Sequence, residues 1–174
     1  MSGAEIKVDE FTPTLVAIAA RLTDMSPVFQ DIGEYLIDST KQRFTEGTAP
    51  DGTAWVPKSQ ATIDAYRSRE AKGGNAKIDF RPLFGASGSL SSNILYEAVE
   101  DGVQWGSNMV YAAVQHFGAA AGELGVTSST DKNGRPYTVA SPWGDIPARP
   151  FIGISDTDRE TILADLSEWI KDGS

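Results

Sequence analysis

The chain has 174 residues, of which 40% are hydrophobic and 22% charged, a composition that predicts one globular domain over residues 1–174. The absence of cysteine and the presence of one histidine exclude disulfides, thiolate chemistry and a multi-histidine metal site within one chain, and we expect no metal and no cofactor. The net charge of −9 disfavours tight binding to nucleic acid. The chain has no long apolar run, so we expect no membrane segment. The N-terminus has no signal pattern, so we expect the protein to stay in the cytosol where it is made.

The N-terminal part of the chain contains two helix-start signals. Residues 1–11 precede them and are typical of a flexible arm or an edge strand. Thr12-Pro13 supplies a cap and a proline at the first helical position, and Ser26-Pro27 repeats the signal. The second signal opens the longest helical pattern, residues 27–46, whose apolar stripe contains Phe29, Ile32, Leu36 and Phe44. Another face of this predicted helix carries three acids, Asp31, Glu34 and Asp38.

A basic stretch follows the turn that Pro50-Asp51-Gly52 predicts. Ser59 is placed to cap a polar helix over residues 60–72. Residues 58–81 hold six basic residues against three acidic ones, and they include Arg67 and Arg69. The end of the chain is acidic instead, so the two charged regions have the signs needed to complement each other between copies.

The centre of the sequence changes its period. Residues 94–99 and 103–107 are β-prone runs around Asp101-Gly102, which predicts a β-hairpin. Helical spacing follows, and Gly118 ends it. A hairpin followed by a short helix cannot bury its own apolar face, so we expect the long helix over residues 27–46 to pack on the hairpin.

Residues 119–143 are rich in small and polar residues. Asn133-Gly134 within them predicts a hairpin turn, so we expect a projecting loop or hairpin that a neighbouring subunit orders. Trp143 lies in this segment and is a candidate to reach a neighbour.

The last part of the chain predicts a strand and a helix. Residues 151–154 have the pattern of a short strand, and a capping box of Thr157 and Glu160 starts a helix over residues 157–171. All elements together predict an α+β fold, with an antiparallel sheet of hairpins packed against the long helix and the C-terminal helix.

Arg149 lies between two prolines, which stiffen the backbone that presents it. A guanidinium held in this way suits a bidentate contact with a carboxylate of a partner, and the alternative is an intrachain salt bridge to the long helix. Arg67, Arg69, Trp143, Arg149 and Phe151 are the candidate interface residues.

Four motifs occur in one order along the chain. They are Pro50-Asp51-Gly52-Thr53-Ala54-Trp55 with Pro57 and Thr62, the Gly-x-Leu element within residues 85–90, Tyr111-Ala112-Ala113-Val114-Gln115-His116-Phe117-Gly118, and Ile146-Pro147-Ala148-Arg149-Pro150-Phe151-Ile152-Gly153. In this order they resemble the phage virion morphogenesis family, the tail-completion or neck proteins of Mu-like phages, over about residues 27–170. The third motif departs from the family pattern, because Gln115-His116 stands where that pattern has His-Gln.

The resemblance implies a structural protein of the virion head–tail junction, with the fold of the small tail-completion proteins and no enzymatic activity. It implies a homo-oligomeric ring, a hexamer or dodecamer, between a connector or head-completion protein and a tail terminator protein. DNA would pass through this ring without specific binding. The acids Asp31, Glu34 and Asp38 are the candidates to face that channel, because a negative lining does not trap phosphates.

An enzymatic alternative centres on His116, the only conventional general base near neutral pH. A small phage lytic hydrolase would pair it with Glu123 or Asp131 and an attacking serine or water. The simpler interpretation is a helix-end histidine that is hydrogen-bonded or faces solvent. A ligand-binding module is a third class, supported only by the mixed α+β pattern.

Overall fold

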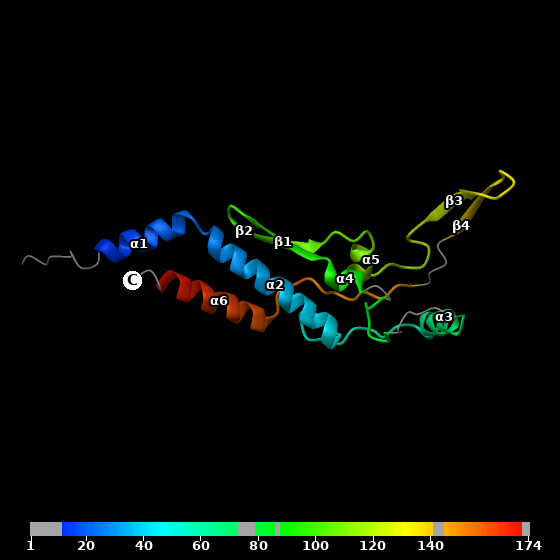
Figure 1. Cartoon of the computed structure of the whole chain (residues 1–174), viewed down its shortest axis with the longest axis horizontal. Coiled ribbons are helices and arrows are strands. Elements are labelled where there is room, and N and C mark those ends of the chain that lie inside the picture. Colours follow the sequence, from blue (N-terminus) through cyan, green and yellow to red (C-terminus); the bar gives the residue numbers. More distant parts are fainter. Residues whose placement is uncertain (1–11, 73–78, 86–87, 141–144, 172–174) are drawn as a thin grey trace, which may run out of the picture. The chain divides into compact units, whose positions relative to one another are not determined.

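The computed structural model describes residues 12–72, 79–85, 88–140 and 145–171, which form six helices and two antiparallel two-stranded sheets (Figure 1). The predicted α+β class is therefore confirmed. The chain divides into two compact units: unit 1 comprises residues 1–38, 96–105 and 154–174, and unit 2 comprises residues 39–95 and 106–153. The predicted arm over residues 1–11 lies outside the described residues. None of the helices in the described ranges combines the length and the hydropathy needed to cross a membrane.

Unit 1 is organised around the first part of helix α2 (Ser26–Glu46), which the sequence predicts to within one residue. Helix α6 (Asp156–Lys171) and the hairpin of β1 (Ile94–Val99) and β2 (Gly102–Ser107) contribute side chains to its core. Helix α1 (Thr12–Thr23) precedes α2 and begins at the predicted residue.

The core of unit 1 confirms that the long helix packs on the hairpin. Val28, Ile32 and Leu36 of α2 are buried at its centre. Partly buried side chains pack around them from the hairpin and from α6, namely Val103, Trp105, Ile162, Leu166 and Trp169. One face of α2 therefore meets two elements that lie far away in the sequence, as a single apolar stripe requires.

Gly33 allows the hairpin to approach α2 closely. A Cβ at this position would lie 2.1 Å from Cδ2 of Tyr96, and the three atoms nearest to it all belong to that ring. Helix propensity alone counts a glycine here as a weakness. In this helix the Tyr96 ring occupies the space that a side chain at position 33 would fill.

The start of α6 corrects the predicted capping box. Ser155, one residue before the helix, accepts a 3.0 Å hydrogen bond at Oγ from the Asp158 amide, and Asp158 Oδ2 accepts a 2.7 Å bond from the Ser155 amide. This reciprocal pair is the capping box, so the prediction of Thr157 and Glu160 was wrong. Tyr35 of α2 also donates its hydroxyl to Asp158 Oδ1 at 3.1 Å, which connects the start of α6 to α2.

Unit 2 contains the last turns of α2 and five complete elements. These are α3 (Gln60–Ala71), α4 (Ser89–Ser92), α5 (Ala112–Phe117), β3 (Val126–Thr130) and β4 (Pro136–Ala140) (Figure 1). Ser59 caps α3 as predicted, because its side chain accepts from the Thr62 amide at 3.3 Å. Strands β3 and β4 pair in antiparallel register from Val126 with Ala140 to Thr130 with Pro136, around the Asn133-Gly134 turn.

An aromatic cluster forms the core of unit 2. Phe44, in the last turns of α2, is fully buried, and its ring centroid lies 5.5 Å from that of Trp55, 6.1 Å from that of Phe84 and 5.3 Å from that of Phe151. The apolar stripe of α2 thus continues from the core of unit 1 into this cluster.

Candidate functional site

Three of the four sequence motifs meet in unit 2, at a place that we call the motif junction (residues 50–57, 111–118 and 146–153). Trp55 Nε1 donates to the Pro150 carbonyl at 2.8 Å, and the Arg149 amide donates to the Gln115 carbonyl at 2.9 Å. Segments that are almost a hundred residues apart are therefore joined by direct hydrogen bonds.

Gly118 ends α5 at the motif junction and fits only as glycine. Its φ is +78°, a region that residues with a Cβ rarely adopt. A Cβ would also lie 2.7 Å from the Ile146 carbonyl oxygen and 2.8 Å from the Ala148 nitrogen. The third and fourth motifs can approach this closely because the side chain is absent.

The predicted strand over residues 151–154 is not formed, and side chains replace the strand partner that its backbone would have needed. Arg43 Nη1 donates to the carbonyls of Phe151 and Gly153, at 3.3 and 2.7 Å. His116 Nδ1 accepts from the amides of Phe151 and Ile152, at 3.3 and 3.5 Å. Two amides and two carbonyls of this segment therefore find partners without a sheet.

His116 has a structural position. Its ring packs edge-on against Phe151 with centroids 5.2 Å apart, and accepting at Nδ1 places the proton of the neutral imidazole on Nε2. Burial lowers the pKa of His116, which favours this neutral, accepting form.

The carboxylates that a hydrolase would use are engaged elsewhere. Glu123 Oε2 accepts from the Ala120 amide at 2.7 Å, and Asp131 Oδ1 accepts from the Asn133 and Arg135 amides at 2.8 Å each. Within the described part of the chain, no carboxylate is hydrogen-bonded to His116. The arrangement therefore supplies no oriented base at this residue.

Arg149 and Phe151 have their side chains inside the chain. Arg149 donates from Nε to the Val56 carbonyl at 2.7 Å and from Nη2 to the Pro57 carbonyl at 3.1 Å. These bonds hold the extended chain before α3, and they replace both the partner carboxylate and the salt bridge to the long helix that the sequence suggested. Burial lowers the pKa of Arg149. Arg149 is 7% and Phe151 2% exposed in the isolated chain, and their role at an interface stays a prediction.

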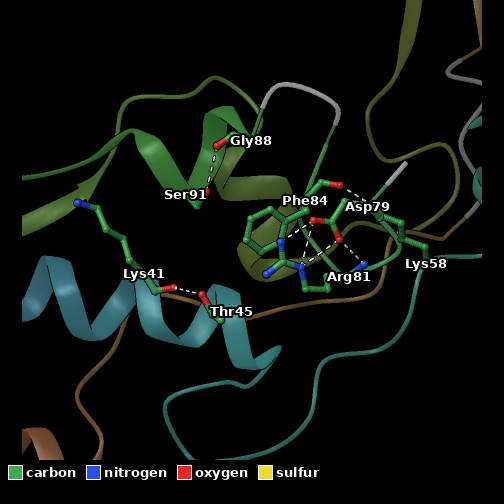
Figure 2. Close-up of polar contacts among 8 residues, drawn as sticks. All are labelled: Lys41, Thr45, Lys58, Asp79, Arg81, Phe84, Gly88 and Ser91. Atoms are coloured by element: carbon green, nitrogen blue, oxygen red, sulfur yellow. Dashed lines mark hydrogen bonds and ion pairs between the residues drawn. The ribbon is translucent and has the colours of Figure 1, made fainter. Parts of the chain in front are cut away.

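Polar contacts fix a short loop, residues 79–84, that ends at Phe84 of the aromatic cluster (Figure 2). Lys58 donates its ammonium to the carbonyls of Asp79 and Phe84, and burial lowers the pKa of this lysine. Asp79 binds the Arg81 guanidinium through both carboxylate oxygens, with bonds of 2.6–3.1 Å, and this hydrogen bonding lowers the pKa of Asp79 to about 2. The Arg81 guanidinium lies 3.8 Å from the centroid of the Phe84 ring. Leu83 in this loop has a φ of +62°, a strained conformation that these contacts maintain.

A sequence model of the phage virion morphogenesis family matches residues 6–171 of the 174. The chain belongs to the phage virion morphogenesis family. Membership identifies it as a structural or assembly protein of a phage virion, and it favours a structural role over an enzymatic one. No curated protein and no solved structure matches the sequence significantly.

For a member of this family, the exposed charged residues are the candidate contact groups. Asp31, Glu34 and Asp38 are all exposed on α2, with the spacing of one helix face. Among the described residues, no group of three or more acids or histidines is arranged to hold a metal ion. These acids therefore form a negatively charged surface, whose role depends on the molecule that lies opposite to it in the virion.

The basic candidates lie on α3. Arg67 and Arg69 are exposed, and the Arg67 guanidinium lies 5.9 Å from the centroid of the Phe80 ring. Arg67 also lies 3.8 Å from Asp64, with both side chains largely in solvent. Pairs of this kind contribute little to stability. Trp143, the remaining candidate, lies outside the described residues.

Proposed function

We propose that the chain is a component of the head–tail junction, where a ring of identical copies joins the tail to the capsid connector and lets DNA pass. The observation that carries the proposal is the family match over residues 6–171. Exposed apolar side chains support it, because Val110 is 98% and Phe117 77% exposed in the isolated chain. Large apolar side chains gathered on a surface are typical of proteins that other subunits cover.

The distribution of charge supports a negative channel. Unit 1 has three basic residues against twelve acidic ones in its described part, a net charge of −9, whereas unit 2 has ten against eight, a net charge of +2. Phosphates bind tightly to clusters of lysine and arginine, so an acidic lining lets DNA slide. The exposed face of Asp31, Glu34 and Asp38 is the proposed lining.

The proposed neighbours are a connector or head-completion protein and a tail terminator protein, with six or twelve copies in the ring. The basic face of α3 would meet acidic surface on one of these proteins or on an adjacent copy. The segment over residues 119–143, which holds the β3–β4 hairpin, would pack on a neighbour. Its amides should then exchange more slowly in the ring than in the isolated chain, and equal rates would contradict this contact.

The decisive experiment is deletion of the gene from its phage. Separate heads and tails should accumulate, and gold-labelled antibody against the protein should mark the junction of wild-type virions. Native mass spectrometry of the purified protein should give the mass of a closed ring. Normal virions without the protein, or a label elsewhere on the particle, would overturn the proposal.

Charge reversal tests the proposed division of the surface. Changing Arg67 and Arg69 to Glu should weaken particle assembly in a salt-dependent way. Changing Asp31 and Asp38 to Lys should leave assembly intact and slow the ejection of DNA. If neither pair changes assembly or ejection, the electrostatic assignment is wrong.

A further inference from the structure

Much of helix α1 is left uncovered by the described part of the chain, where Ala17, Ile18 and Arg21 are half-buried. It is 12 residues long and none of its residues is buried. Helices of this length are marginal in water, and in proteins they depend on packing of an apolar face. Near its C-terminal end, Arg21 connects it to α6, because this side chain donates to the Trp169 carbonyl and lies 5.7 Å from the centroid of the Trp169 ring.

Three large apolar side chains of α1 are exposed, whereas Ile18 is half-buried. Leu15, Val16 and Leu22 are 62%, 63% and 52% exposed, and we call them the α1 patch. Leu15 and Leu22 are seven residues apart, which places them on the same side of the helix. A helix that exposes its leucines and buries nothing is complete only when another surface covers it.

A second exposed apolar set lies at the ends of α5 in unit 2. It consists of Val110, Tyr111 and Phe117, which we call the α5 patch. Phe117 contacts the ring of His116 at a centroid distance of 4.5 Å but remains 77% exposed. Each unit of the chain therefore carries an exposed apolar patch, in addition to other exposed apolar side chains such as Leu163 of α6.

We infer that the α1 patch of one copy docks on the α5 patch of the next copy. This inference rests on the ring proposed above, because a closed ring needs two different surfaces on every copy. Charge selects the pairing. Contact between two copies of unit 1 would bring together two surfaces whose described parts have a net charge of −9 each, whereas the described part of unit 2, at +2, has the opposite sign.

Two blocked variants test the pairing. Leu15→Glu with Leu22→Glu blocks the α1 patch, and Val110→Glu with Phe117→Glu blocks the α5 patch, in each case at side chains that are already exposed. Each variant alone should be monomeric by sedimentation velocity and native mass spectrometry. An equimolar mixture should give a heterodimer and nothing larger, because one intact α1 patch and one intact α5 patch remain between them.

Controls separate this pairing from other causes. Leu163→Glu changes an apolar side chain of α6 that is 57% exposed and lies outside both patches, so it should keep the wild-type oligomer. Val110→Glu alone, at a side chain that is 98% exposed, is a second α5-blocked variant that cannot disturb internal packing. In α5-blocked protein the unchanged α1 should also exchange its amides faster than in the wild-type oligomer.

The outcomes distinguish this inference from the proposed function. Oligomers formed by either blocked variant alone, or a mixture that remains monomeric, would overturn the pairing, while labelling of the virion junction would still support the function. A wild-type chain that is monomeric at high micromolar concentration would also overturn the pairing. Failure to find the protein at the head–tail junction would overturn the function, whatever the variants do in solution.

Discussion

Replacing Gly33 by alanine tests the packing of the β1–β2 hairpin on α2, because two effects of opposite sign act at this position. Alanine in place of glycine inside a helix favours folding by about 0.8–1 kcal/mol. In this chain the new Cβ would lie 2.1 Å from Cδ2 and 2.6 Å from Cγ of Tyr96. Because Cγ is close to the backbone, the whole ring has to move. Overpacking of this kind costs about 1–3 kcal/mol, so we expect the free energy of unfolding to fall by up to about 2 kcal/mol.

A double-mutant cycle with Tyr96→Ala separates the two effects. Once the ring is removed, Gly33→Ala should raise the free energy of unfolding by up to about 1 kcal/mol, which gives a coupling of about 1–3 kcal/mol. Urea denaturation of the four proteins, followed by tryptophan fluorescence, measures these values. Gln30→Gly, at an exposed position of the same helix, reports the local cost of a glycine. Equal effects of Gly33→Ala with and without the ring would refute the contact between Tyr96 and α2.

Three further predictions follow from buried contacts. Arg43→Met leaves the carbonyls of Phe151 and Gly153 without this donor. Urea denaturation should therefore show a free energy of unfolding that is lower by about 1–3 kcal/mol for each carbonyl. An unchanged free energy of unfolding would contradict the role of this side chain. Leu36→Ala should cost about 2–5 kcal/mol, and an unchanged melting temperature would show that α2 is not the centre of unit 1. The pKa of His116 is lower in the folded chain than in the unfolded chain, where it is about 6.5. As the pH falls, the unfolded chain therefore binds the proton first. The free energy of unfolding should decrease as the pH drops from about 6.5 towards 5. His116→Gln should abolish this pH dependence, since the chain has no other histidine, and should leave the yield of infectious particles largely intact; a folded variant with a yield lower by several orders of magnitude would contradict the structural role.

Local signals in the sequence were sufficient to predict the positions of most of the helices and turns. Proline after a capping residue located the start of α2 to within one residue, and Ser59 capped α3 as its position predicts. Each of these features depends on residues only a few positions apart. The capping box of α6 shows the limit of such reasoning, because Ser155 and Asp158 have the same spacing as Thr157 and Glu160, and the contact from Tyr35 to Asp158 comes from a residue 123 positions away.

The candidate site was less predictable because its contacts are not local. Residues 151–154 have the composition of a strand, but their backbone is bound by Arg43, which is 108 residues before Phe151, and by His116, which is 35 residues before it. The stiffness of the chain at Arg149 was evident from its two flanking prolines. The partners of Arg149 were not evident from the sequence. A guanidinium can donate to the backbone carbonyl of any residue, so the sequence around Val56 and Pro57 contains no charge pattern that would identify them as partners.

The third motif shows which surface the sequence could have indicated. Within it, Ala112 is buried, His116 accepts two backbone hydrogen bonds and Gly118 fits only without a side chain, so each has an internal reason for its identity. Phe117 has no comparable reason, since it is 77% exposed and touches only the edge of the His116 ring. A large apolar side chain that the interior does not use is expected to be used outside it. The interior of unit 2 therefore accounts for these three residues but not for Phe117, on which a neighbouring copy would act in the proposed ring.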